Sequence, residues 1–345
     1  MELQFIEKSN LEVFVQNLME NYRVEGVMEK DKSYYYGPIQ SAQELCLGFD
    51  TTLIPPKKYF LPPREILFRF STAPQLEITS EIEDKPFIIF GVHPYDLKAI
   101  RQMDQVFTSG VSDPHYLKRR RSALLIGVDP TAVAPNAFWA DMEAATVSNC
   151  FDLMLTDIGE GFVVETGSEK GREVLDRFAL PRTATQEQAR ERVKVRSRIT
   201  SLCEKRGLSF PKKEIPKLLE RSRGKIFWEE QAGKCLSCGS CNLVCPTCYC
   251  FDVKDHIDLD LVHGERFRRW DGCLLHDFAK VATGENFRES RTSRYRHRFM
   301  RKGLYLYGVL NDVACVGCGR CASACLPDIA DPVKALNHLK ESETL

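Results

Sequence analysis

Two short cysteine runs constrain the fold of this chain more than any other feature. The first spans residues 235–245 and reads CLSCGSCNLVC, and the second spans residues 315–325 and reads CVGCGRCASAC. Both follow the spacing C-x2-C-x2-C-x3-C, in which three thiolates hold one 4Fe-4S cluster and the fourth binds the neighbouring cluster. The sequence therefore predicts two adjacent 4Fe-4S clusters, between which electrons can pass.

This spacing rule divides the eight thiolates into two crossed sets. One cluster is predicted at Cys235, Cys238, Cys241 and Cys325. The other is predicted at Cys315, Cys318, Cys321 and Cys245. Zinc and disulfides are the alternatives, because paired C-x2-C units also build zinc sites. A zinc site needs only four ligands, whereas each run offers a third and a fourth cysteine at cluster spacing, so the cluster interpretation is favoured.

Composition is consistent with an intracellular redox protein. Most of the 14 cysteines lie between Cys235 and Cys325, which suits thiolate ligands better than scattered disulfides. The first ten residues are charged and lack the apolar stretch of a signal peptide, and no apolar run is long enough to cross a bilayer. We expect a soluble cytoplasmic protein with no membrane span. The 48 basic and 48 acidic side chains cancel, so net charge indicates no partner.

The chain divides near residue 222. Residues 1–222 are predicted to form an α/β domain for partner docking, and residues 223–345 a ferredoxin-like dicluster domain held by clusters more than by a large apolar core. Strands are predicted at Pro86–Val92, Ala123–Val128, Phe151–Leu155 and Gly161–Glu165. Helices are predicted at Leu11–Asn21, Asp96–Val106, Gly167–Phe178 and Gln186–Arg206.

Three further thiols lie between the two runs, at Cys248, Cys250 and Cys273. They cannot complete a site with four ligands unless another group joins them. His276, His256 or a side chain of a partner is a candidate for that position, which would give a third metal centre. The alternative is that the three cysteines are small buried residues, as free cysteines often are. Both interpretations remain open on sequence alone.

The segment between the runs also contains a basic insertion. From Phe287 to Lys302, seven positive charges face one acidic residue, Glu289, and two aromatic residues are interspersed. The positive charges are Arg288, Arg291, Arg294, Arg296, Arg298, Arg301 and Lys302. Because no nucleic-acid fold signature accompanies them, we expect no nucleic-acid partner. They are better suited to offsetting the negative charge of clusters or to steering association.

Several strings together resemble one family. They are CLSCGSCNLVCPTCYCFDV (235–253), RRWDGC (268–273), GENFRE (284–289), CVGCGRCASAC (315–325), KKYFLPPREILF (57–68), FGVHPYDLKAI (90–100) and DPHYLKRRRSALLIG (113–127). This combination is similar to the iron-sulfur beta subunit of cytosolic NiFe sulfhydrogenases and to the related 4Fe-4S dicluster subunit of the anaerobic sulfite reductases. The resemblance covers most of the chain.

The resemblance implies an electron-transfer subunit of a soluble oxidoreductase complex. In such complexes the dicluster subunit relays electrons between a flavoprotein, which binds FAD and NAD(P)H, and a second redox subunit, such as a hydrogenase small subunit, a sulfite reductase or a heterodisulfide-reductase-like subunit. The chain itself has no G-x-G-x-x-G fingerprint after a strand, so we expect no substrate site on it. The alternative is an iron-sulfur redox sensor or assembly scaffold without turnover.

The chain departs from the family pattern in its N-terminal half. Many relatives have cysteines in three stretches that read here His93–Asp96, Val128–Pro130 and Ala137–Trp139. Because those thiols are absent, the resemblance implies no cluster in the N-terminal domain. The remaining cysteines are scattered and are interpreted as structural: Cys46, Cys150 and Cys203.

Overall fold

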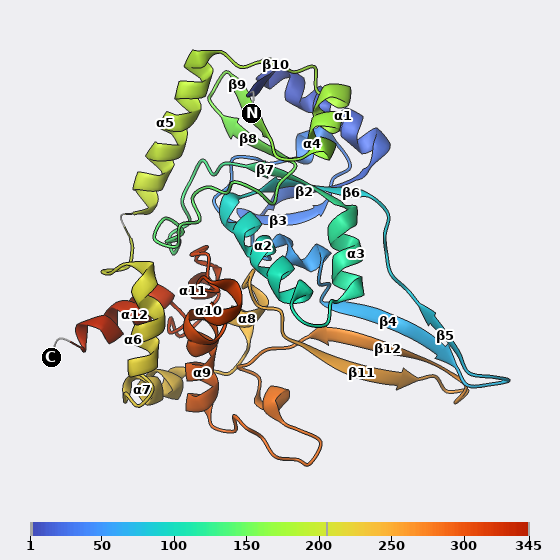
Figure 1. Cartoon of the computed structure of the whole chain (residues 1–345), viewed down its shortest axis with the longest axis vertical. Coiled ribbons are helices and arrows are strands. Elements are labelled where there is room, and N and C mark those ends of the chain that lie inside the picture. The colour runs from blue at the N-terminus through green and yellow to red at the C-terminus, as the bar shows by residue number, and fades with distance from the viewer. Residues whose placement is uncertain (1–2, 205, 344–345) are drawn as a thin grey trace.

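The computed structural model describes residues 3–204 and 206–343, which form a large and a small β-sheet (Figure 1). The large sheet has the strand order β10-β1-β9-β8-β7-β6-β2-β3. Its strands are β1 (Gln4–Glu7), β2 (Arg23–Lys30), β3 (Ser33–Pro38), β6 (Phe87–Val92), β7 (Ala123–Val128), β8 (Leu153–Asp157), β9 (Gly161–Thr166) and β10 (Arg182–Thr183). The central strands β2, β6, β7 and β8 run parallel, and the outer pairs are antiparallel.

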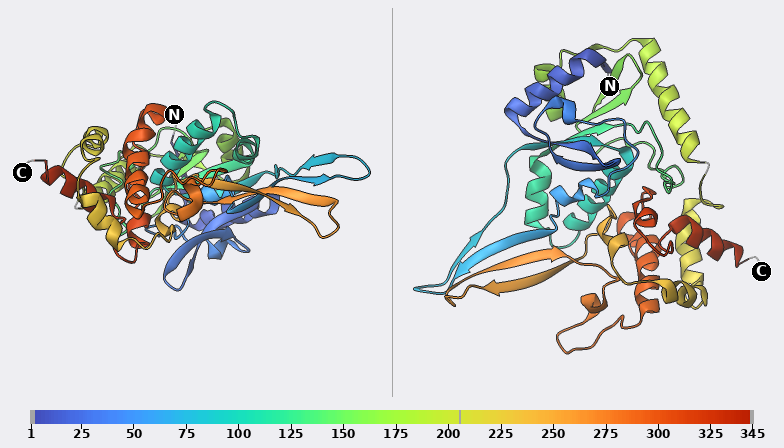
Figure 2. Two further views of the ribbon diagram at one scale, coloured as in Figure 1. Left: turned by 90° about the horizontal axis from the view of Figure 1, so that it is seen from below. Right: turned by 180° about the vertical axis from the view of Figure 1, so that it is seen from behind.

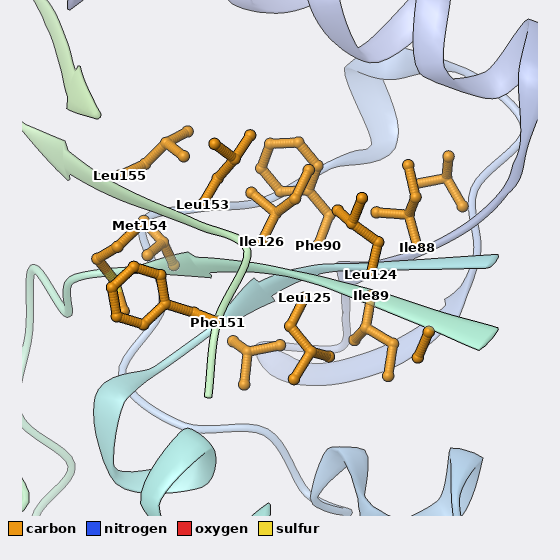
Figure 3. Packing of buried hydrophobic residues seen from close by; sticks show 14 of the residues in the cluster. Ile88, Ile89, Phe90, Leu124, Leu125, Ile126, Phe151, Leu153, Met154 and Leu155 are labelled. Carbon is orange, nitrogen blue, oxygen red and sulfur yellow. The ribbon is translucent and has the colours of Figure 1, made fainter. Parts of the chain in front are cut away.

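The parallel centre of this sheet is the first hydrophobic core. Every residue of β6 and β7 is buried, as expected of parallel strands that are covered on both faces. Side chains alternate between the faces, so that Ile88, Phe90 and Ile126 lie on one side of the sheet and Ile89 and Leu125 on the other (Figure 3). The continuous apolar runs in the sequence therefore have a structural reason.

Helices cover both faces of the large sheet. They are α1 (Lys8–Asn21), α2 (Pro94–Thr108), α3 (Pro114–Ser122), α4 (Glu169–Phe178) and α5 (Gln186–Cys203). Figure 1 shows α1 and α4 on one side of the sheet and α2 and α3 on the other. Local capping fixes where they begin: the Asp113 carboxylate accepts a hydrogen bond from the Tyr116 N–H, and Thr185 and Gln188 form a capping box.

The α/β prediction for the N-terminal half is confirmed. Strand β7 has the bounds that the sequence predicts, and the other predicted strands and helices form within a few residues of their expected ends. The helix predicted over Gln186–Arg206 ends at Cys203, and residue 205 lies outside the described residues.

The small sheet joins segments that are distant in sequence. It has the order β11-β12-β4-β5, with all neighbours antiparallel, and extends from the body of the molecule as an arm (Figures 1 and 2). Its strands are β4 (Arg64–Ser71), β5 (Glu77–Ser80), β11 (Phe251–Ile257) and β12 (His263–Trp270). Because β12 pairs with β4, part of the segment between the cysteine runs is built into the same sheet as the N-terminal half.

A second hydrophobic core holds the C-terminal half together. Its helices are α6 (Ile215–Arg221), α7 (Phe227–Lys234), α8 (Ser240–Leu243), α9 (Arg291–Met300), α10 (Tyr307–Leu310), α11 (Arg320–Ser323) and α12 (Pro332–Glu341). Single turns are η1 (Ala42–Glu44), η2 (Pro56–Tyr59), η3 (Lys212–Glu214), η4 (His276–Ala279) and the π-turn η5 (Arg301–Tyr305). Buried rings of Trp228, Tyr295 and Phe299 lie 5.3–6.1 Å apart, centroid to centroid. This half therefore has a sizeable apolar core, to which α7 and α9 contribute large aromatic side chains, and the sequence did not predict that core.

Residues from both sides of position 222 share this second core. Phe138, Trp139 and Ile199 pack in it together with Trp228 and Leu336. The insertion between the cysteine runs does not form a separate unit either, since β11 and β12 belong to the small sheet and α9 to the core. The division of the chain into two domains near residue 222 stays a prediction. No helix among the described residues is long and apolar enough to cross a membrane.

Candidate iron-sulfur centres

The two cysteine runs have similar backbones. Gly239 and Gly319 have φ angles of 75° and 79°, and each precedes a short helix, α8 or α11, that carries the third cysteine of its run. Space also requires glycine in the second run: a Cβ on Gly319 would lie 2.5 Å from the backbone of Asn136, and one on Gly317 would lie 2.6 Å from the backbone of Trp139. The second run is thus pressed against residues 136–139.

The runs bring their cysteines together in two cavities. The first cavity is lined by Cys315, Cys318, Cys321 and Cys245. The second cavity is lined by Cys235, Cys238, Cys241 and Cys325. Each cavity therefore receives three cysteines from one run and the fourth from the other, which is the crossed arrangement that the spacing predicts. The donor sets fit two 4Fe-4S clusters, which take four thiolates each.

Both cavities have apolar walls. Phe138, Met142 and Leu219 line the first, and Leu274 and Ile329 line the second. Polar groups reach the sulfurs at short range: the Ser237 N–H donates to Cys235 Sγ at 3.4 Å, and the Thr247 hydroxyl lies 3.4 Å from Cys245 Sγ. An apolar shell with a few hydrogen bonds to sulfur is what sets the reduction potential of such clusters.

Burial disfavours the thiolate form of several of these cysteines when no metal is bound. Burial raises the pKa of Cys241 and of Cys315 to about 12. Cys245 is different, because a hydrogen bond from Cys248, together with Lys302, holds its pKa well below the ordinary value despite burial. Since a thiolate is the metal ligand, binding of clusters at these sites releases protons.

Arg298 of α9 borders all three cysteine cavities of this region, the two above and a third described below. Its side chain is buried and its Nε has no hydrogen-bond partner. Burial opposes the charge, but nearby Cys241, Cys321 and Cys245 thiolates raise the pKa of Arg298 above its ordinary value. A buried guanidinium at this point partly offsets the negative charge of the thiolates that surround it.

The third cavity contains the three remaining thiols of the C-terminal half. Cys248, Cys250 and Cys273 line it, together with Asn242, which donates from Nδ2 to Cys248 Sγ at 3.6 Å and to Cys273 Sγ at 3.5 Å. The histidines considered from sequence as fourth ligands are exposed and do not line it: His256 lies in β11 and His276 in η4. The sequence analysis did not identify Asn242 as part of a site, although a polar residue inside the first cysteine run could have indicated it.

The basic stretch does not act as one surface. Arg294 and Arg298 are buried, and Arg294 donates to the carbonyl of Leu274 at 3.2 Å. Lys57 is a further buried cation that sequence patterns did not indicate; its Nζ donates to the Cys248 carbonyl at 2.9 Å. Cations from three elements, η2, α9 and η5, therefore surround the cysteine cavities.

The cysteines of the N-terminal half lie apart from these cavities. Cys46 packs against the first core, Cys203 is buried in the second, and the Arg120 side chain donates to Cys150 Sγ at 3.3 Å. In the described residues, no three His, Cys, Asp or Glu side chains are close enough to hold a single metal ion. A 4Fe-4S cluster does not need such convergence, because each thiolate binds a different iron.

Two comparisons with known proteins agree with this geometry. Residues 234–329 match the family model described as a 4Fe-4S dicluster domain. The chain is 32% identical over 331 residues to sulfhydrogenase 2 subunit beta of Pyrococcus furiosus, an alignment that covers 95% of each chain. The residues matched by the family model include both cysteine runs and the segment between them. The chain therefore belongs to the family of the sulfhydrogenase beta subunit and contains a 4Fe-4S dicluster domain.

Proposed function

We propose that this chain is the electron-transfer iron-sulfur subunit of a multisubunit oxidoreductase of the hydrogenase type. One observation carries the proposal. Each of two cavities is lined by four cysteines drawn from both runs, and the buried Arg298 side chain lines both cavities. Sites that share a side chain are close enough for direct electron transfer between them. Membership of the sulfhydrogenase beta-subunit family supports the same role.

Two 4Fe-4S clusters are proposed, with the crossed ligands described above. Each cluster, when bound, accepts and releases one electron. The protein residues position the thiolates, exclude water through the apolar walls, and supply positive charge from Arg298 and Lys302. None of these residues provides an acid, base or nucleophile for a substrate. The chain relays electrons, and the reactions at either end occur on other subunits.

The site of Cys235, Cys238, Cys241 and Cys325 is the better candidate for exchange with a partner. Cys238 is exposed, whereas Cys318 of the second run is buried. Leu236 and Leu326 flank the site with 61% and 90% of their surface exposed. Exposed apolar residues beside a redox site suit a protein interface, since their burial stabilises the complex. The site of Cys315, Cys318, Cys321 and Cys245 is then the inner site of the relay.

The proposed partners are a flavoprotein subunit that binds FAD and NAD(P)H and a second redox subunit, such as a hydrogenase small subunit or a reductase. A cytoplasmic location suits this assembly, because free thiols and clusters persist in reducing compartments. The competing role is a redox sensor or an assembly scaffold. Sensors use an exposed or incomplete cluster, whereas both sets here have four thiols, most of them at least partly buried.

Electron transfer from a flavoprotein tests the proposal. The purified, cluster-loaded chain should not oxidise NAD(P)H on its own, but its visible absorbance should bleach when excess NAD(P)H is added together with a catalytic amount of the flavoprotein of its own complex. The control is the Cys318→Ala/Cys321→Ala variant, which lacks two ligands of the inner site and should accept fewer electrons. A cluster-loaded chain that the flavoprotein cannot reduce, or one that oxidises NAD(P)H alone, contradicts a relay.

A further inference from the structure

The third cavity has no role in the two clusters proposed above. Its three thiols come from separate places: Cys248 and Cys250 follow the first run, and Cys273 lies just after β12. Sequence spacing alone does not require them to meet, but the fold brings them to one cavity beside α8 and η5. Small buried cysteines can fill a core without any function, so further observations must decide between packing and metal binding.

The first such observation is Asn242. Its side chain is 2% exposed, and its Nδ2 donates to the sulfurs of both Cys248 and Cys273. Its Oδ1 is buried and has no hydrogen-bond partner. Because a buried acceptor without a partner costs free energy, such groups usually indicate a missing water, ion or ligand. Asn242 therefore points to a ligand in the cavity independently of the thiols.

The second observation is an excess of positive charge around the cavity, in which the Arg298 and Lys57 side chains are buried. Arg298, Arg301 and Lys302 line the cavity, and the Lys57 ammonium donates to the Cys248 carbonyl and lies 4.3 Å from the centre of the Trp270 ring. Among the described residues, no Asp or Glu forms an ion pair with Lys57, Arg298 or Lys302. Buried charges need a counter-charge. Neutral thiols cannot provide it, whereas thiolates bound to an anionic iron-sulfur cluster can.

The spacing of the thiols favours a cluster over a single ion. A zinc ion requires its sulfurs to converge at about 2.3 Å from one centre. The described residues contain no such convergence, either here or in the two cavities that match the dicluster spacing. In a 4Fe-4S cluster, by contrast, each thiolate binds a different iron, so the sulfurs need not converge on one centre.

We propose that Cys248, Cys250 and Cys273 hold a third iron-sulfur cluster, with a fourth position that is not a thiolate. Asn242, whose amide contacts the sulfurs of Cys248 and Cys273, is the candidate for that position. Where the position is filled by another group, Asn242 orients these two ligands. The centre lies beside both proposed clusters, since Arg298 borders all three cavities and Cys248 is two residues from Pro246 and three from Cys245. It extends the relay toward the arm, because β11 begins directly after Cys250.

Iron and sulfide analysis of the anaerobically purified chain tests the proposal. The wild type should contain about eleven or twelve irons, eight from the two 4Fe-4S clusters and the rest from the third centre. The Cys273→Ala variant should lose about three or four irons while it keeps the EPR signals of the other two clusters. Those two signals also show that the variant is folded. The matched control is Cys203→Ala, a buried cysteine outside all three cavities, which should keep the full iron content.

A second variant separates packing from metal binding. Asn242→Leu keeps the size of the side chain but removes its amide, so it should change the EPR spectrum or the potential of the third centre without altering the iron of the other two. A wild type with about eight irons, and a Cys273→Ala variant with the same content, overturn the third centre and leave the proposed relay intact. Fewer than about eight irons in a folded, reconstituted wild type contradict the two-cluster proposal itself.

Discussion

Cys245 links the two cysteine runs at the scale of single residues. It belongs to the first run in sequence, yet it lines the cavity of Cys315, Cys318 and Cys321. The sequence predicted this crossed arrangement from spacing alone, because in such runs the fourth cysteine binds the cluster of the other run. Sequence included Arg298 among the cations suited to offset the clusters, but it did not predict Lys57 or the burial of either side chain, which depends on the folding of η2 and α9 against the cysteine loops.

The Cys245→Ser variant tests crossed ligation. It should change the EPR signal of the cluster at Cys315, Cys318 and Cys321, because serine replaces one of its thiolates, and leave the other cluster nearly unchanged. EPR spectra of the reduced variant and wild type make the comparison, with Cys203→Ser as the control. A change confined to the cluster at Cys235, Cys238 and Cys241 means that each run closes its own cluster.

Replacement of Arg298 tests the role of buried charge. Arg298→Met keeps the length of the side chain and removes a positive charge that borders all three cavities. Reduction adds negative charge to a cluster, and a nearby guanidinium stabilises that reduced form. Without it, the reduction potentials should become more negative, by on the order of 60 mV for each 1.4 kcal/mol by which the reduced cluster is destabilised. Redox titration followed by EPR measures the shift.

Arg296→Met is the matched control for that titration. It lies on the same helix, but its guanidinium donates to the Arg223 carbonyl at an exposed site. Its removal should leave the potentials unchanged. Equal potentials in Arg298→Met and wild type exclude an electrostatic role for Arg298.

At the scale of elements, sequence predicted local structure well and long-range pairing poorly. Strand β7 was predicted at its observed bounds, because six consecutive apolar residues between polar flanks indicate a buried strand. The pairing of β4 with β12 was not predicted, since no local pattern specifies a partner almost two hundred residues away. For the same reason, sequence indicated the third set of thiols but not Asn242, which meets them only in the folded chain.

Glu65 of β4 connects the arm to the body of the molecule. Its buried carboxylate accepts hydrogen bonds from Arg268 Nε of β12 at 2.6 Å, from Arg119 of α3, and from His115 Nδ1 at 3.1 Å. Glu65→Ala leaves at least one buried guanidinium without its partner, so unfolding should become easier by about 3–5 kcal/mol. Glu77→Ala, on the exposed strand β5, should change stability by less than about 0.5 kcal/mol.

Denaturation under anaerobic conditions measures both variants. The near-ultraviolet signal of Trp270, whose indole donates to the Leu61 carbonyl at 2.8 Å, reports on the base of the arm. Glu65→Ala should unfold at a clearly lower denaturant concentration than Glu77→Ala. Similar midpoints for the two variants show that the Glu65 ion pairs do not attach the arm.

At the scale of the whole molecule, the second cysteine run is attached to the N-terminal half of the chain. Arg320, between Gly319 and Cys321 of the second run, forms a buried ion pair with Asp96 of α2 at 2.7 Å and donates to the Thr52 carbonyl at 2.7 Å. The N-terminal α/β fold therefore positions the second run directly. A relay needs such rigidity, because the distance between redox sites controls the rate of electron transfer.

Metal analysis and Mössbauer spectroscopy of the iron-57-enriched wild type test the central claim most directly. The relay requires 4Fe-4S signals that account for at least about eight irons per chain, with matching acid-labile sulfide. These signals should change on reduction by NAD(P)H in the presence of the proposed flavoprotein partner. Zinc in place of iron, or 4Fe-4S signals from only one cluster in the fully loaded chain, would contradict the account.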